Sequence, residues 1–279
     1  MPDLSTLDPM AIAARLAYPE AEVWQWVCDR DECDGMPHDS WTQRHARTKQ
    51  RPPTGEWFVW LIIAGRGFGK TRTGAEWLAK QVRDRPGFHW AIAARSTQDC
   101  REVCMEGESG LLRRLGLEIE SQQYNRTTGE IRLPGNTVIH SYGAEQPDRF
   151  RGPNLAGAWC DELATWKYMA AVWHEGLMPA LRVGNPRVLV TTTPRAVPLI
   201  KELVARDDGS VIVTRGSTYE NAANLSENAL RELRRRYEGT RIGRQELYGE
   251  VIEDIEGALW TRTIVDDHRV VWADDAQPA

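Results

Sequence analysis

Residues 56–71 read EWFVWLIIAGRGFGKT and carry the signals that decide the fold. The first nine residues form a continuous apolar run rich in aromatic and β-branched side chains, which is typical of a strand buried in a parallel sheet. The glycine-rich stretch that follows ends in Gly69-Lys70-Thr71, and residues 71–82 have the apolar spacing of a helix. A strand, a glycine-rich turn and a helix that begins at Lys-Thr together predict a phosphate-binding loop, or P-loop.

The turn has the chemistry that this loop needs, with one departure from the motif. Its glycines allow successive backbone N–H groups to point at an anion, and the helix that follows adds its unpaired N–H groups. Lys70 would reach the β- and γ-phosphates, and the Thr71 hydroxyl would bind Mg²⁺. Ala64 stands where the motif has its first glycine. The alternative is a glycine-rich turn with an incidental Lys-Thr pair. The predicted nucleotide-binding residues of the loop are Gly65, Arg66, Gly67, Phe68, Gly69, Lys70 and Thr71.

A second buried strand, LAGAWCDE at residues 155–162, ends in two carboxylates. Parallel strands end at the same edge of a sheet, so we expect these carboxylates beside the P-loop. We predict that Asp161 holds Mg²⁺ and that Glu162 swings towards the nucleotide and deprotonates the attacking water. The alternative is a helix N-cap, a common role for Asp before a helix.

A third strand end lies in RVLVTTTPR at residues 187–195. Here Thr191, Thr192 and Thr193 would emerge next to the phosphates, where hydroxyls can sense the γ-phosphate and couple it to neighbouring elements. The alternative is a β-branched strand end followed by a proline turn. Arg66, inside the P-loop, is either a contact to the γ-phosphate or a solvated loop arginine.

The rest of the pattern alternates short buried strands with helices, which predicts an α/β fold with a largely parallel sheet. Further strands are expected at residues 88–94 and 210–215, and a hairpin over 130–142. Helices are expected at residues 9–17, 20–29, 97–105, 166–175, 196–205, 227–239 and 240–250.

Composition narrows the class of protein. The chain has 279 residues, 41% of them hydrophobic, and a net charge of −5. The longest apolar run, Val59–Ala64, is too short to cross a bilayer, and the N-terminus lacks a secretory signal. The five cysteines predict reduced thiols in a cytoplasm, since their number is odd. A zinc interpretation is disfavoured because the spacing fits no common pattern; its four residues would be Cys28, Cys33, His38 and His45.

The three motif segments together resemble a known family. Residues 46–77, RFRGPNLAGAWCDELATW at residues 149–166 and VLVTTTPR at residues 188–195 are similar to the ATPase domain of large terminase subunits. The resemblance is to tailed bacteriophages, of the type found in HK97-like phages and gene transfer agents. It implies a P-loop NTPase of the additional-strand, conserved-glutamate type, with a mostly parallel sheet flanked by helices and a small helical lid.

The resemblance also implies roles that the residues alone do not give. Gln50 would contact adenine, and Arg151 would act as an arginine finger on the nucleotide of a neighbouring subunit. The organisation it implies is an N-terminal helical segment (1–50), an ATPase core (51–215), a lid (216–252) and a linker (253–279). The linker would lead towards a nuclease domain that we do not expect in this chain, so nuclease activity is not expected of it.

The function implied is a motor that hydrolyses ATP with Mg²⁺ to translocate double-stranded DNA into a procapsid. Expected partners are the DNA, the portal protein and the small terminase subunit, in a homo-oligomeric ring that forms on assembly from a chain that is monomeric in isolation. The expected location is the cytoplasm of the bacterial host, with no membrane association. Two alternatives are a nucleotide-responsive assembly module that docks on portal or small terminase, and a helicase-like motor. Arginines of the last two helices either grip DNA phosphates or form a solvated face: Arg231, Arg234, Arg235, Arg236, Arg241 and Arg244.

Overall fold

The computed structural model describes residue 41 and residues 45–250. The predicted helices at 9–17 and 20–29, the linker at 253–279 and three of the four weighed zinc ligands lie outside this part of the chain. Eight strands form one sheet in the order β3-β4-β5-β2-β6-β7-β1-β8. In chain order they are β1 (Val59–Ala64), β2 (His89–Ala94), β3 (Tyr124–Asn125), β4 (Glu130–Leu133), β5 (Thr137–Gly143), β6 (Gly157–Asp161), β7 (Arg187–Thr192) and β8 (Val211–Gly216).

The sheet confirms the predicted α/β architecture. The six strands from β5 to β8 in sheet order run parallel, and the hairpin of β4 and β5 adds an antiparallel edge with β3. Strands β6 and β7 lie between β1 and β2, although they follow both in the sequence. This insertion puts the ends of the three motif strands side by side: Thr191 of β7 is in register with Asp161 of β6 and with Ile62 of β1.

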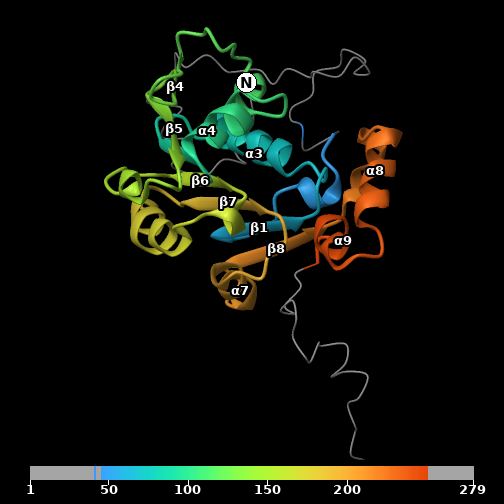
Figure 1. Cartoon of the computed structure of the whole chain (residues 1–279). Coiled ribbons are helices and arrows are strands. Elements are labelled where there is room, and N and C mark those ends of the chain that lie inside the picture. The colour runs from blue at the N-terminus through green and yellow to red at the C-terminus, as the bar shows by residue number, and fades with distance from the viewer. Residues whose placement is uncertain (1–40, 42–44, 251–279) are drawn as a thin grey trace, which may run out of the picture.

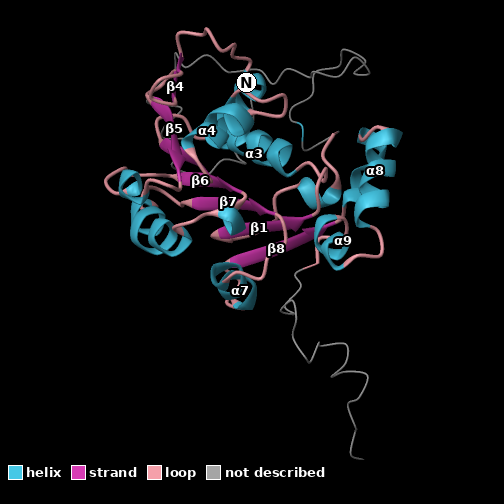
Figure 2. Cartoon of the chain, viewed as in Figure 1, coloured by secondary structure: helices cyan, strands magenta, loops and turns pink. Residues whose placement is uncertain are grey.

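Helices cover both faces of the sheet (Figures 1 and 2). On one face α3 (Lys70–Asp84), α4 (Thr97–Asp99) and α5 (Leu111–Leu115) pack with the π-helix η3 (Cys100–Met105). On the other face lie α7 (Pro198–Ala205), the 3₁₀-helix η4 (Pro147–Phe150), the π-helix η6 (Ala171–Leu177) and α6 (Met178–Ala180). Strand β1 is buried throughout because its alternate side chains enter the two cores.

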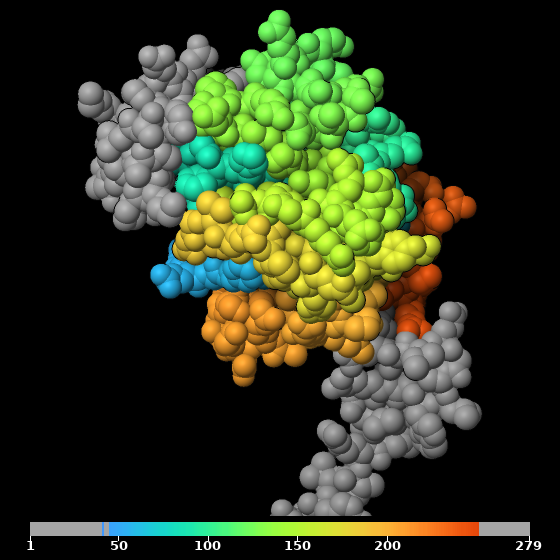
Figure 3. Space-filling view, turned by 90° about the vertical axis from the view of Figure 1, so that its left-hand side faces the viewer, coloured from blue at the N-terminus to red at the C-terminus, as the bar shows by residue number. Residues whose placement is uncertain are grey.

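The view of Figure 3 shows where the second group of elements lies. The yellow-green and yellow segments, which include η4 and η6, form the middle of that face of the molecule. Helices α8 (Glu227–Tyr237) and α9 (Arg241–Glu246) lie instead beside the end of the sheet where β1 and β8 finish (Figure 1). Among the described residues, no helix is long and apolar enough to cross a membrane.

Two predicted helices differ from the structure. The segment at 97–105 contains only one α-helical turn, α4, and then widens into η3. The helix predicted at 166–175 does not begin at Trp166, whose backbone is extended while its indole Nε1 donates to the Asp161 carbonyl. The short 3₁₀-helix η5 (Leu163–Thr165) precedes this turn, and η6 follows it. Apolar spacing could not show that the indole would be used to close the end of β6.

Helix α3 sits on β6 through a glycine. The Gly74 position approaches the Trp159 indole so closely that an added Cβ would overlap the ring. Trp159 is fully buried, and its Nε1 donates a hydrogen bond of 3.0 Å to Thr191 Oγ1. The helix that begins the P-loop is therefore docked directly on the strand that carries the carboxylates.

This contact predicts that Gly74→Ala destabilises the protein. Overpacking against Trp159 should lower the free energy of unfolding by about 1–3 kcal/mol, even though alanine favours helix. Chemical denaturation of the single and double variants with Trp159→Phe measures the coupling. The cost of Gly74→Ala should be smaller when it is combined with Trp159→Phe, and equal costs in both backgrounds would contradict the contact.

Candidate functional site

An open cavity of about 940 Å³ lies where β1, β6 and β7 end. Residues of the predicted nucleotide-binding set form much of its wall. Those that line it are Gln50, Arg66, Gly67, Phe68, Gly69, Lys70, Thr71, Asp161, Glu162 and Thr193. Gly65, Thr191 and Thr192 stand behind the wall, and Arg151 does not line this cavity.

The P-loop joins β1 to α3 in a curled conformation. Gly67 and Gly69 have φ angles of 71° and 95°, which L side chains rarely adopt. Gly65 is needed for space, because an added Cβ would lie 2.5 Å from the Glu246 carbonyl oxygen and 2.8 Å from Thr218 Oγ1. Ala64 in place of the motif glycine is accommodated as the buried last residue of β1, paired with Gly216.

Lys70 is buried and held by the loop that precedes it. Its Nζ donates to the carbonyl oxygens of Ala64 (2.9 Å) and Gly65 (3.2 Å) and lies 3.4 Å from Glu162 Oε1. These three acceptors leave the ammonium group at the first turn of α3, facing the same cavity as the P-loop backbone. The arrangement concentrates positive charge where a phosphate would lie.

Asp161 is a buried carboxylate with few compensating charges. Thr191 Oγ1 donates to its Oδ1 at 2.7 Å, and the Cys104 thiol lies 3.7 Å from its Oδ2. Burial, and then the negative charge of Glu162, raise the pKa of Asp161 to about 6. A buried anion of this kind is stabilised by a nearby cation, which is the electrostatic condition of a metal site.

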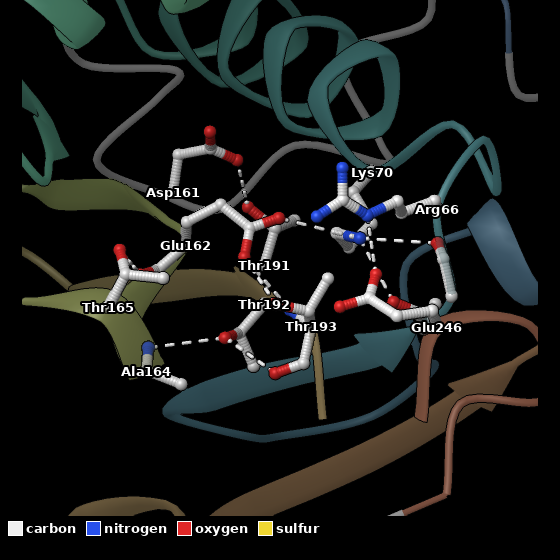
Figure 4. A network of polar contacts seen from close by, with 12 residues as sticks. Arg66, Lys70, Asp161, Glu162, Ala164, Thr165, Thr191, Thr192, Thr193 and Glu246 are labelled. Atoms are coloured by element: carbon white, nitrogen blue, oxygen red, sulfur yellow. Dashed lines mark hydrogen bonds and ion pairs between the residues drawn. The ribbon is translucent and has the colours of Figure 1, made fainter. Parts of the chain in front are cut away.

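Glu162 is turned towards the cavity by its backbone. It adopts the left-handed conformation with φ 49° and ψ 44°, which is uncommon outside glycine and is found at functional sites. Its Oε2 accepts hydrogen bonds from Thr193 N (3.0 Å) and Thr193 Oγ1 (2.9 Å), while its Oε1 faces Lys70 (Figure 4). The left-handed turn is what brings two successive strand residues to the same cavity.

The three threonines at the end of β7 each contact the acidic strand end. Thr191 holds Asp161, and Thr193 holds Glu162. Thr192 Oγ1 accepts from the Ala164 backbone N–H at 3.1 Å and donates to the Thr193 carbonyl (Figure 4). Any movement at the end of β7 is therefore passed to both carboxylates.

Arg66 is paired with a residue far along the chain. Its Nε lies 2.5 Å from Glu246 Oε2 at the end of α9, and its backbone N donates to the Glu246 carbonyl. The side-chain hydrogen bond raises the pKa of Arg66. Further contacts join the same loop to the segment after β8: Thr218 Oγ1 donates to the Arg66 carbonyl, and Asn221 Nδ2 donates to the Gly67 carbonyl.

Gln50 lies against the P-loop with both ends of its amide engaged. Its Nε2 donates to Thr73 Oγ1 at 3.0 Å, and its Oε1 accepts from the backbone N and the Nε of Arg47. Arg47 in turn donates to the Phe68 carbonyl and stacks over the Phe68 ring at 4.5 Å. Adenine would have to replace one of these bonds in order to contact the Gln50 amide.

Arg151 lies at the surface next to η4. Its guanidinium is 3.0 Å from Glu175 Oε2 and 3.6 Å from Asp148 Oδ1, and the side chain is 59% exposed. Since Arg151 is absent from the wall of the cavity, it does not contribute to the site of its own chain in this conformation.

Several residues of the site carried no signal in the sequence. Arg47 and Glu246 are an arginine and a glutamate among many, and only their three-dimensional contacts single them out. The wall also contains residues from the N-terminal side, from the turn after β7 and from the segment after β8. Those not predicted include Trp41, His45, Arg195, Asn221, Asn224, Leu225 and Glu246.

The donor set fits Mg²⁺ better than a metal bound by protein groups alone. Among the described residues there is no group of three or more His, Cys, Asp or Glu side chains placed to hold a metal ion. Mg²⁺ usually takes only one or two protein oxygens and completes its shell with water and phosphates. The Thr71 hydroxyl and the Asp161 carboxylate face one cavity and would supply such oxygens.

Comparison with known proteins places this site in a family. The family model "Terminase large subunit, T4likevirus-type, N-terminal" matches residues 61–266. Comparison with curated proteins gave no significant match.

Among solved structures, the Thermus phage P74-26 large terminase ATPase domain has a TM-score of 0.55 at 18% identity, covering 78% of this chain and 94% of that one. The large terminase of a thermophilic bacteriophage in complex with ADP has a TM-score of 0.56 at 15% identity, covering 75% and 50%. The HK97 bacteriophage large terminase has 0.50 at 17%, covering 70% and 47%. The chain thus spans about half the length of the last two proteins, and the likeness shows a shared fold.

The raised pKa of Asp161 predicts a pH-dependent cost to stability. Between its ordinary value of 3.8 and about 6, the folded protein keeps a proton that the unfolded chain has released. The free energy of unfolding therefore falls as pH rises through this window. Without divalent cations, Asp161→Asn should be about 1–3 kcal/mol more stable than the wild type near neutral pH.

Urea unfolding at a series of pH values tests this, and the gain should shrink towards about pH 4. The exposed carboxylate Asp208 provides the control, because its pKa is lowered by hydrogen bonds from Ser210 and Asp208→Asn should give no gain. A gain of Asp161→Asn that does not depend on pH would contradict the assignment.

Proposed function

Because the chain belongs to the large terminase subunit family, we propose that it hydrolyses ATP with Mg²⁺ to move double-stranded DNA during phage genome packaging. The observation that carries the proposal is the meeting of Lys70 and Glu162, 3.4 Å apart, at the ends of β1 and β6. A P-loop lysine opposite a strand-end glutamate provides both parts that phosphoryl transfer to water needs: a phosphate cradle and a base.

The nucleotide phosphates would lie against the P-loop. The backbone N–H groups of residues 65–71 and the start of α3 would surround them, and Lys70 would exchange its carbonyl acceptors for the β- and γ-phosphates. Thr71 and Asp161 would hold Mg²⁺, whose chemistry is to neutralise charge on the phosphates. These roles are supported by the common cavity that the three side chains line.

Glu162 would act as the general base. A water oxygen attacks the γ-phosphorus as the bond to the β–γ bridging oxygen breaks, and Glu162 takes the proton that the water loses. In the structure this carboxylate is held by Thr193 and Lys70, so it must give up part of these contacts to bind the water. Thr191–Thr193 would thereby couple the state of the γ-phosphate to the sheet.

The segment after β8 would serve as the lid, within the proposed division at residues 216–252. Arg66 is bound to Glu246 of α9, so a contact from Arg66 to the γ-phosphate requires that this ion pair open. Nucleotide binding would then change the position of α9 relative to the P-loop. Gln50 would contact adenine after a similar exchange of partners.

Arg151 would complete the site of an adjacent subunit. Its surface position next to η4 and its absence from the cavity wall of its own chain support a role in trans. The proposed assembly is a ring of several copies of a chain that is monomeric in isolation, formed at the portal in the host cytoplasm, with portal protein and small terminase subunit as partners.

DNA contact is proposed to be independent of base sequence, through phosphates. The last two helices are weaker candidates for it than their arginine count suggests. Arg235 pairs with Glu232, Arg244 pairs with Glu250, and Arg234 stacks over Tyr219. These contacts favour the solvated face for part of the set.

We expect Glu162→Gln to abolish hydrolysis while nucleotide still binds. The amide cannot take a proton, but it keeps the size of the side chain and one acceptor for Thr193. Phosphate release should fall by at least about 100-fold, and ATP binding by calorimetry should stay within about threefold. Glu202→Gln, on the exposed α7, is the matched control and should hydrolyse ATP normally. Normal turnover by Glu162→Gln would remove it from the role of base.

Trans action of Arg151 predicts complementation between inactive variants. The specific ATPase activity of the wild type should rise with protein concentration and with duplex DNA, whereas Arg151→Ala and Glu162→Gln should each be inactive. A mixture of the two should recover activity, because the intact Glu162 of one chain then meets the intact Arg151 of another. A mixture that stays inactive, with wild-type activity independent of concentration, would indicate a site complete within one chain.

A further inference from the structure

Arg195 extends the turn after β7 into the wall of the nucleotide cavity. It is exposed and lines the cavity together with Lys70, Glu162 and Thr193. It lies two residues beyond Thr193, whose N and Oγ1 bind the Glu162 carboxylate. The side chain therefore projects from the same short segment that holds the proposed base.

Arg195 differs from the other arginine and lysine side chains of the wall. Each of those has an acidic partner: Arg66 with Glu246, Lys70 with Glu162, Arg72 with Glu76 and Arg95 with Asp99. The described part of the chain offers Arg195 no ion pair or side-chain hydrogen bond. A guanidinium that lines a cavity without a partner can bind an anion without first breaking an internal contact.

The backbone that carries Arg195 is fixed on both sides. Pro194 is buried, and Pro198 is the first residue of α7. Between them the Val197 backbone N donates to the Arg195 carbonyl at 2.8 Å, which closes a tight turn. The prolines restrict φ, so the position of the Cα of Arg195 does not depend on a ligand and little backbone entropy is lost on binding.

From these observations we propose that Arg195 binds the γ-phosphate of ATP in its own subunit, which rests on the proposed function. The γ-phosphate is favoured over the α- and β-phosphates because it must lie next to Glu162, and Arg195 shares a segment with the threonine that holds Glu162. The planar guanidinium can donate two parallel hydrogen bonds to two γ-oxygens. Arg195 would thus distinguish ATP from ADP and report the loss of the γ-phosphate to Thr193.

The test compares a non-hydrolysable ATP analogue with ADP. With the full chain and Mg²⁺, calorimetry should show that Arg195→Ala weakens binding of the analogue by about 10- to 100-fold, with ADP binding within about twofold of the wild type. Arg195→Lys should recover part of the loss, since it keeps the charge but not the fork. Arg206→Ala, an exposed arginine at the end of α7 outside this cavity, should leave both affinities unchanged.

Thermal unfolding of the apo variants should match the wild type, because Arg195 has no partner to lose among the described residues. Equal loss for analogue and ADP, or no loss for either, would overturn the proposal. So would an effect seen only in DNA-stimulated turnover, which would assign Arg195 to a DNA phosphate.

The variant Lys70→Ala separates this proposal from the function on which it rests. If Lys70→Ala loses nucleotide binding while Arg195→Ala still prefers the analogue as the wild type does, only the role of Arg195 fails. If Lys70→Ala binds both nucleotides like the wild type, the proposed function fails and the role of Arg195 fails with it.

Discussion

The hydrogen bond from Thr191 to Asp161 links the two strands on which the rest of the site depends. It is 2.7 Å long and joins β7 to β6 at the point where Thr191 is also in register with Ile62 of β1. Trp159 donates to the same hydroxyl while its ring supports Gly74 of α3. Because these groups are buried and close-packed, the helix that follows the P-loop and the strand that carries the carboxylates cannot shift independently.

Around this fixed centre, the charged groups of the cavity are arranged in pairs that a nucleotide would have to replace. Lys70 faces Glu162, and Arg66 faces Glu246. The Arg66 pair is more than half exposed on the arginine side, so it contributes little to stability and can open at small cost. The buried carboxylate of Asp161 is different, because its partners are a hydroxyl and a thiol rather than a cation. A ligand that brings positive charge to Asp161 and negative charge to Lys70 would improve both environments at once.

The sequence allowed the fold and the centre of the site to be predicted because they depend on local signals. The apolar run of β1, the Gly-Lys-Thr turn and the acidic end of β6 each occupy a few consecutive residues, and parallel pairing then brings their ends together. The pairing of Arg66 with Glu246 could not be predicted in this way, since the two residues are 180 positions apart and no motif pairs them. The left-handed backbone of Glu162 and the extended backbone of Trp166 likewise result from tertiary contacts, so helical spacing placed the following helix too early.

The positions of Arg151 and Arg195 divide the work of two arginines in a way that the order of the motifs does not suggest. Arg151 belongs to the segment that resembles a finger motif, yet it lies on the surface with two acidic neighbours. Arg195 belongs to no predicted role, yet it lines the cavity with its backbone fixed and its charge unopposed among the described residues. An arginine held in acidic contacts at the surface must be moved or met by another chain before it meets a phosphate, whereas a preorganised one can respond as soon as ATP enters. Binding of ATP by one subunit and completion of the site by its neighbour would then be separate steps, each governed by its own arginine.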